Sequence, residues 1–188
     1  MLLSKEGRSF YAFLFGMGSN NCPFVCGDGV DAVVSAEINS YRGRESVQFV
    51  LKDIVWNDDE DQRDGQVEQV YQRFRAGEPL TPRQALLLSP TRDDLVAVFR
   101  HVKGHAQQDR LVCPPRPLYR RIRYEASKGM NLGKLQVCLD IFNEFDIFAC
   151  KPCGGQVEIT VLKRQGKADI NGSRILKHLL QQASKSEG

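Results

Sequence analysis

Residues 39–48 read NSYRGRESVQ, and this stretch decides how the first part of the chain folds. Polar and β-forming residues flank the tetrapeptide Tyr41-Arg42-Gly43-Arg44. Glycine accepts the positive φ angle that a tight hairpin turn needs. The stretch therefore predicts two antiparallel strands that are joined at Arg42-Gly43.

Strand patterns continue on both sides of this turn. Apolar or alternating residues occupy 9–16, 30–38 and 46–55, and glycine-rich clusters separate them. No helical periodicity interrupts the region. We therefore expect residues 1–56 to form a small antiparallel barrel or sandwich.

The composition changes after residue 56. Residues 57–61 are acidic, and Val67, Val70, Tyr71 and Phe74 then form one apolar helical face. Three prolines follow between residues 78 and 90. We expect residues 57–90 to be an acidic loop, a helix and a linker.

The sequence pattern of residues 91–188 predicts a helical domain that ends with a β-hairpin and a last helix. Helices are expected from Arg92, where Thr91 to Asp94 resembles a capping box, around Leu118 and from Asn131. Alternation over residues 157–161 predicts a strand of the hairpin. Three helices and a hairpin form a winged-helix-like unit, so the predicted class is α+β.

The composition excludes several kinds of protein. The chain has 188 residues, of which 41% are hydrophobic, and a net charge of +3. No stretch approaches the roughly 20 apolar residues that cross a bilayer. The first residues do not resemble a signal peptide, so we expect a cytoplasmic protein without membrane contact. The six cysteines should then be thiols or metal ligands.

The hairpin turn is the first candidate binding site. It carries Tyr41 next to Arg42 and close to Arg44. Bases stack on tyrosine and arginines neutralise phosphates, so this pattern suits single-stranded nucleic acid. The alternative is a hairpin tip that is merely exposed to water.

A second basic cluster lies in the predicted helix around Leu118. Helical spacing places Arg116, Arg120 and Arg123 on one face, where they could contact phosphates. The alternative is a solvated helix face without a partner.

Two pairs of cysteines raise the question of a zinc site. Cys22 and Cys26 are four residues apart, and Cys150 and Cys153 have the shorter spacing of a zinc knuckle. Four thiolates would meet only if the two predicted domains came together. Buried or unliganded thiols are the alternative, and we expect neither a metal nor a catalytic site in this chain.

Residues 15–54 contain an ordered set of motifs: Phe15 to Gly18, Val30-Asp31, Glu37 to Gly43, Val47-Gln48 and Lys52 to Ile54. This set resembles the OB-fold domain of the RecJ family of exonucleases, which are specific for single-stranded DNA. The later part resembles the C-terminal region of Gram-positive, clostridial-type RecJ proteins, in segments 88–94, 139–145 and 166–173.

This resemblance implies a 5′-to-3′ exonuclease of recombination and repair that uses Mn²⁺ or Mg²⁺ in an Asp-His-His core. No such core is recognisable among the three histidines here, so the chain resembles a non-catalytic segment, and the missing nuclease domains would be its partner. The family's first OB strand would precede Met1, which leaves the barrel incomplete and one edge unpaired.

The resemblance also implies which residues and partners matter. Positions that match the family's DNA-guiding surface are Tyr41, Arg42, Arg44, Gln48 and Lys52. Single-stranded DNA and the single-stranded DNA-binding protein are the implied partners.

Two other functions remain open from the sequence. One is an independent winged-helix DNA-binding regulator, in which Lys134 and Gln136 would enter a major groove. The other is a protein-interaction module that docks partners through its acidic loop and basic helix.

Overall fold

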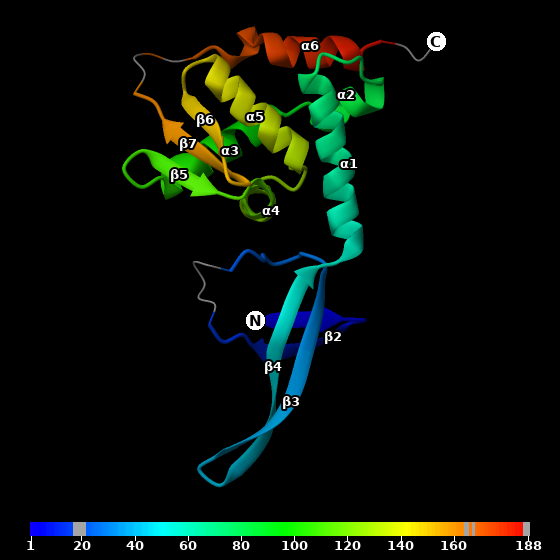
Figure 1. Ribbon diagram of the computed structural model, residues 1–188, viewed down its shortest axis with the longest axis vertical. Coiled ribbons are helices and arrows are strands. Elements are labelled where there is room, and N and C mark those ends of the chain that lie inside the picture. Colours follow the sequence, from blue (N-terminus) through cyan, green and yellow to red (C-terminus); the bar gives the residue numbers. More distant parts are fainter. Residues whose placement is uncertain (17–21, 164–165, 167, 186–188) are drawn as a thin grey trace. The chain divides into compact units, whose positions relative to one another are not determined.

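The computed structural model describes residues 1–16, 22–163, 166 and 168–185. It divides into two compact units, residues 1–61 and 62–188. The two units contain one sheet each, and helices accompany the second sheet (Figure 1). Met17, Gly18 and Lys167, which belong to the motifs of the family resemblance, lie outside the described residues.

The first unit is built on a four-stranded sheet. Its strands are β1 (Leu2–Lys5), β2 (Arg8–Phe13), β3 (Val30–Tyr41) and β4 (Arg44–Trp56), in the spatial order β1-β2-β4-β3. The pairs β1–β2 and β3–β4 are antiparallel, as expected. The pair β2–β4 is parallel, so the expectation of a purely antiparallel sheet is wrong.

This sheet is open in the described part of the chain, where β1 and β3 form its two edges. The parallel pair arises because β4 returns from the hairpin into the position between β3 and β2. The core of the unit contains Ala12, Val50 and Leu51, which are buried. The rings of Phe10 and Phe49 lie 5.1 Å apart.

The predicted hairpin at residue 43 is confirmed. Arg42 and Gly43 both have positive φ, at 52° and 73°, which is the two-residue turn that matches strand twist. Tyr41 pairs with Arg44 directly beside it. Because β2 pairs with β4 only at Phe49 and Val50, the turn end of the β3–β4 ribbon projects past β2 (Figure 1).

The second unit begins within helix α1. Its elements are α1 (Asp58–Arg75), α2 (Pro82–Leu88), α3 (Arg92–His105), β5 (Arg110–Cys113), α4 (Pro115–Glu125), α5 (Leu132–Glu144), β6 (Phe148–Cys153), β7 (Gln156–Val161), η1 (Ile170–Gly172) and α6 (Arg174–Ala183). The strands form an antiparallel sheet in the order β5-β7-β6.

Residues 57–90 contain the expected helix, but the acidic residues belong to that helix and the segment after it is not a plain linker. The acidic stretch from Asp58 belongs to the first turn of α1, so the expected loop is helical. The apolar face that includes Val67 and Phe74 packs against the core of the second unit. Leu80, Ala85 and Leu88 belong to that core, so the segment is part of the unit's structure.

Helix α5 is the centre of the second unit. It contacts α2, α3, α4, α6 and β6, and Leu135, Val137, Cys138 and Ile141 are fully buried. A Cβ atom at Gly133 would clash with the Leu88 side chain and approach Val67 Cγ1 to 2.9 Å. Glycine at this position therefore allows α1 and α2 to pack closely on α5.

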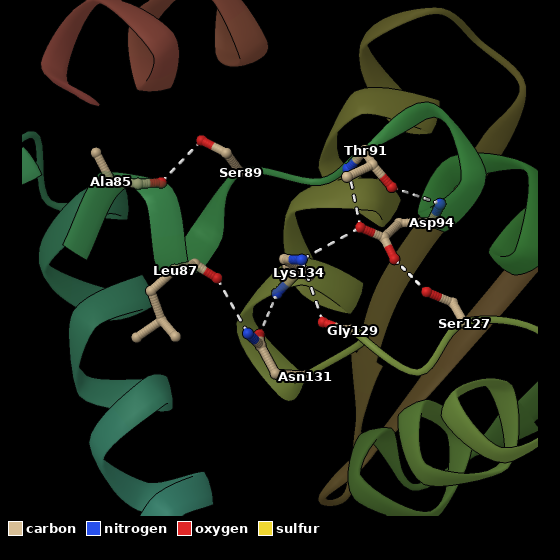
Figure 2. A network of polar contacts seen from close by, with 9 residues as sticks. All are labelled: Ala85, Leu87, Ser89, Thr91, Asp94, Ser127, Gly129, Asn131 and Lys134. Carbon is tan, nitrogen blue, oxygen red and sulfur yellow. Dashed lines mark hydrogen bonds and ion pairs between the residues drawn. The ribbon is translucent and has the colours of Figure 1, made fainter. Parts of the chain in front are cut away.

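A polar network holds the start of α3 against α5 (Figure 2). Thr91 and Asp94 form the predicted capping box, with both reciprocal hydrogen bonds present. The buried carboxylate of Asp94 also accepts hydrogen bonds from Ser127 and from Lys134 Nζ, the latter at 3.3 Å. Asn131 caps α5 and donates to the Leu87 carbonyl, which connects α2 to the same network.

Candidate nucleic-acid interface

The β3–β4 register brings most of the predicted binding residues to one face of the ribbon. Opposite residues of an antiparallel pair share a face, and every second residue along each strand follows them. Tyr41 pairs with Arg44, and Glu37 pairs with Gln48. Tyr41, Arg44 and Gln48 therefore lie on the same side of the sheet.

Strand β2 adds two aromatic residues to this side. Phe13 lies beside Val50, which alternates with Gln48, so Phe13 and Tyr11 share the face of Tyr41. Tyr11, Phe13 and Tyr41 are 73%, 51% and 66% exposed. We call this surface the Tyr41 face; it consists of Tyr11, Phe13, Glu37, Asn39, Tyr41, Arg44, Ser46, Gln48 and Lys52. Lys52 lies at the β-bulge of β4 and joins this face through its contact with Glu37.

Sequence reasoning missed Tyr11 and Phe13. Residues 9–13 read SFYAF, and the aromatic rings at positions 10, 11 and 13 do not reveal which side is buried. The structure separates them, because Ala12 is buried and Phe10 packs on Phe49. Strand alternation alone puts Tyr11 and Phe13 on the same side of β2. Only the pairing of β2 with β4 shows that this is also the side of Tyr41.

The charges of the Tyr41 face are mostly accessible. Arg42 stands at the turn, with its guanidinium 5.2 Å from the centre of the Tyr41 ring. Arg44 has no ion pair among the residues that the structure describes. Lys52 lies 3.2 Å from Glu37, but both side chains are about half exposed, and such pairs are weak. Phosphate groups could therefore replace Glu37 as the partner of Lys52.

The second predicted cluster is not an open surface. Arg120 is fully buried and donates to Asp64 of α1 at 2.8 Å and to the Tyr119 hydroxyl at 3.1 Å. The prediction that Arg120 contacts phosphate is therefore wrong for this structure. Helix spacing correctly places it near Arg116, but α1 covers that side of α4, and Arg116 lies 3.9 Å from Glu68.

Arg123 is partly exposed beside this buried pair. Its guanidinium lies 5.7 Å from the centre of the Tyr119 ring. Burial and the hydrogen bond to Asp64 raise the pKa of the Tyr119 hydroxyl, so this tyrosine stays neutral and donates to the carboxylate. The α4 cluster thus contributes to packing between α1 and α4.

Helix α5 does not present Lys134 and Gln136 for a major groove. Lys134 Nζ binds Asp94 and the Gly129 carbonyl, and its side chain is only 15% exposed. The amide oxygen of Gln136 is buried. The alternative interpretation, in which these two residues of a recognition helix enter a major groove, is therefore not supported, because the surrounding elements bury α5.

The cysteines lie in two separate units. Cys22 and Cys26 belong to the first unit, and Cys150 and Cys153 belong to the second. In the described part of the chain, no three His, Cys, Asp or Glu residues come together as a metal site. Burial raises the pKa of Cys150 to about 12, so this residue is a thiol at neutral pH.

The two histidines four residues apart on α3 pack against each other. The rings of His101 and His105 stack 4.1 Å apart, and Glu125 lies 2.9 Å from His101 Nδ1. Burial lowers the pKa of His101, although Glu125 opposes that shift. This arrangement is a packed pair of imidazoles.

None of the described helices is long and apolar enough to span a lipid bilayer.

Comparison with known proteins identifies one region. Residues 1–53 match the family model of the RecJ OB domain. Searches of curated proteins and of solved structures found no match. The match covers the four-stranded unit that carries the Tyr41 face, so an OB domain at the N-terminus is supported.

Proposed function

We propose that the first unit binds single-stranded nucleic acid on the Tyr41 face. The observation that carries this proposal is the strand register, which places three exposed aromatic rings and Arg44 on one side of an OB-domain sheet. OB-folds bind oligonucleotides on a strand face and in adjacent loops. The projecting hairpin turn of residues 41–44 is such a loop.

The chemistry of this face favours unpaired strands over duplexes. A base in a single strand can stack on an exposed ring, which stabilises the complex by roughly 1–3 kcal/mol per base. Bases inside a duplex are stacked on each other and are not available. Arg42, Arg44 and Lys52 would neutralise phosphates, so affinity should fall as the salt concentration rises.

In a wider context, we propose that the chain is a non-catalytic segment of a RecJ-like exonuclease. It would hold single-stranded DNA for 5′-to-3′ cleavage by a nuclease core that is not in this sequence. Mn²⁺ or Mg²⁺ would belong to that core, and a role in cytoplasmic recombination and repair would follow. The single-stranded DNA-binding protein is a proposed partner.

We propose a separate role for the second unit. The helices α3, α4 and α5 followed by the β6–β7 hairpin support a winged-helix-like description of residues 91–188. Strand β5 pairs with β7 and extends the hairpin into a sheet. Because α5 is covered, we propose that this unit supports the enzyme or contacts proteins rather than reading a duplex with α5.

Fluorescence anisotropy with the full chain tests nucleic-acid binding. The probes are a labelled 15-nucleotide single strand and a duplex of the same length. We expect tighter binding to the single strand and a loss of about fivefold or more in Tyr41→Ala and Tyr11→Ala. Tyr124→Ala is the matched control, because Tyr124 is 61% exposed on α4.

Two outcomes would overturn this proposal. One is tighter binding to the duplex than to the single strand. The other is an equal loss of affinity in Tyr41→Ala and Tyr124→Ala, since the Tyr41 face would then have no special role.

A further inference from the structure

The second unit contains a groove of about 1030 Å³ that the nucleic-acid proposal does not use. Helix α3 forms one wall, and residues at and beyond the end of β7 contribute the other. Val96 and Phe99 of α3 and Leu162 after β7 line it while remaining 36–38% exposed. The groove therefore presents apolar side chains that are not fully covered.

The floor of the groove is fixed by aromatic packing. The Phe99 ring stacks on Phe148 with ring centres 5.8 Å apart and planes at 10°, and it lies 6.2 Å from Phe142. Phe142 and Phe148 are themselves buried. An apolar ligand would therefore meet a preformed surface, which reduces the entropy cost of binding.

The rim of the groove is basic. Arg92, Arg100 and Lys103 of α3 line the groove together with Phe99. Positions 92, 99 and 103 fall on one face of the helix, and position 100 lies at the edge of that face. Lys163 adds a fourth cation, while Asp109 and Asp169 are the acidic residues among those that line the groove. No ion pair engages these four cations within the described ranges.

We propose that this groove binds an acidic peptide segment of another protein, with apolar side chains of the peptide on the floor and its carboxylates at the rim. Charge complementarity selects acidic partners and speeds their association. The apolar floor selects segments with aliphatic or aromatic anchors. This inference rests on the second unit alone and is independent of the Tyr41 face.

A nucleic acid fits the groove less well than such a peptide. One side of the Phe99 ring is covered by Phe148, and Lys103 Nζ lies 5.9 Å from its centre. A base therefore has at most one side of this ring on which to stack, whereas aliphatic side chains can pack on Val96 and on the edge of Phe99. The basic rim alone would bind phosphates without using the floor.

Selection of a random 12-residue peptide library on the immobilised full chain tests this inference. We expect enriched peptides to combine several Asp or Glu residues with at least one Phe, Leu, Ile or Trp. The affinity of a labelled enriched peptide should fall at least tenfold in the double variant Arg100→Glu, Lys103→Glu. Val96→Asp should weaken it too, because the new carboxylate removes an apolar contact and repels the acidic groups of the peptide.

A charge reversal outside the groove serves as the control. Arg83→Glu reverses an exposed charge on α2 and should leave peptide affinity unchanged. Failure to enrich acidic peptides, or binding that the double variant does not change, would overturn the inference. So would a double variant that loses single-stranded DNA affinity as strongly as Tyr41→Ala, since the groove would then be a nucleic-acid surface. Circular dichroism establishes that each variant is folded.

Discussion

Arg120 Nη2 of α4 donates to Asp64 Oδ2 of α1 at 2.8 Å, and both side chains are buried. Both residues belong to the second unit, and the ion pair joins α1 to α4 within that unit. Breaking a buried pair by removing one partner typically costs about 3–5 kcal/mol, because the remaining charge is uncompensated.

We therefore predict that Arg120→Ala lowers the free energy of unfolding by roughly 3 kcal/mol or more. Urea denaturation followed by circular dichroism measures the change. Arg116→Ala, whose partner is 3.9 Å away at the surface, should cost less than about 1 kcal/mol. A stable Arg120→Ala protein that has lost DNA affinity would instead restore the sequence-based interpretation of this arginine.

Asp94 should make the second unit sensitive to acid. Burial alone would raise the pKa of its carboxyl, but hydrogen bonds from Ser127 and Thr91 and the charge of Lys134 hold that pKa below its ordinary value of 3.8. The stabilisation is complete above the ordinary value and disappears as the pH falls through the lower, folded-state value.

Asp94→Asn tests this assignment. At pH 7 the substitution should cost about 2 kcal/mol, since it removes the charge that faces Lys134 and weakens the capping box. The difference between wild type and variant should shrink as the pH is lowered below 3.8. A difference in unfolding free energy that stays constant from pH 7 to pH 2 would show that the Asp94 charge contributes nothing.

We predict that Arg42 lowers the stability of the turn but raises the affinity of the chain for single-stranded DNA. It adopts a φ of 52°, a conformation that costs a residue with a side chain about 1 kcal/mol relative to glycine. Arg42→Gly should therefore slow hydrogen exchange of the β3–β4 amides and at the same time reduce affinity for single-stranded DNA severalfold. Faster exchange, or unchanged affinity, would contradict this role.

Local chemistry made the hairpin and the helix starts predictable from the sequence. Gly43 indicates its turn, and Thr91 and Asp94 indicate the start of α3, because each signal lies within a few neighbouring residues. The sequence predicted that Tyr41, Arg44 and Gln48 belong to one candidate site, because all three lie in the same hairpin. The same local reasoning places Phe142 on the apolar face of α5.

Tertiary contacts explain what the sequence did not reveal. The spacing of Arg116, Arg120 and Arg123 describes a helix face but not that α1 covers it. The sequence around Lys134 is typical of an exposed helix position, and it does not reveal that Asp94 of α3 forms an ion pair with this lysine. Strand β5 has four residues and depends on β7, which follows more than 40 residues later. The parallel pairing of β2 with β4 likewise has no local signal.

Photo-cross-linking is the most direct test of the central claim that the Tyr41 face holds unpaired nucleic acid. The full chain would be irradiated with a single-stranded oligonucleotide that contains 5-iodouracil, and the cross-linked peptides would be identified by mass spectrometry. The account predicts adducts on Tyr41 and on Tyr11 or Phe13, which an unlabelled single strand suppresses and a duplex does not. Adducts confined to α4 or to the α3 groove, with residues 8–13 and 37–48 unmodified, would contradict it.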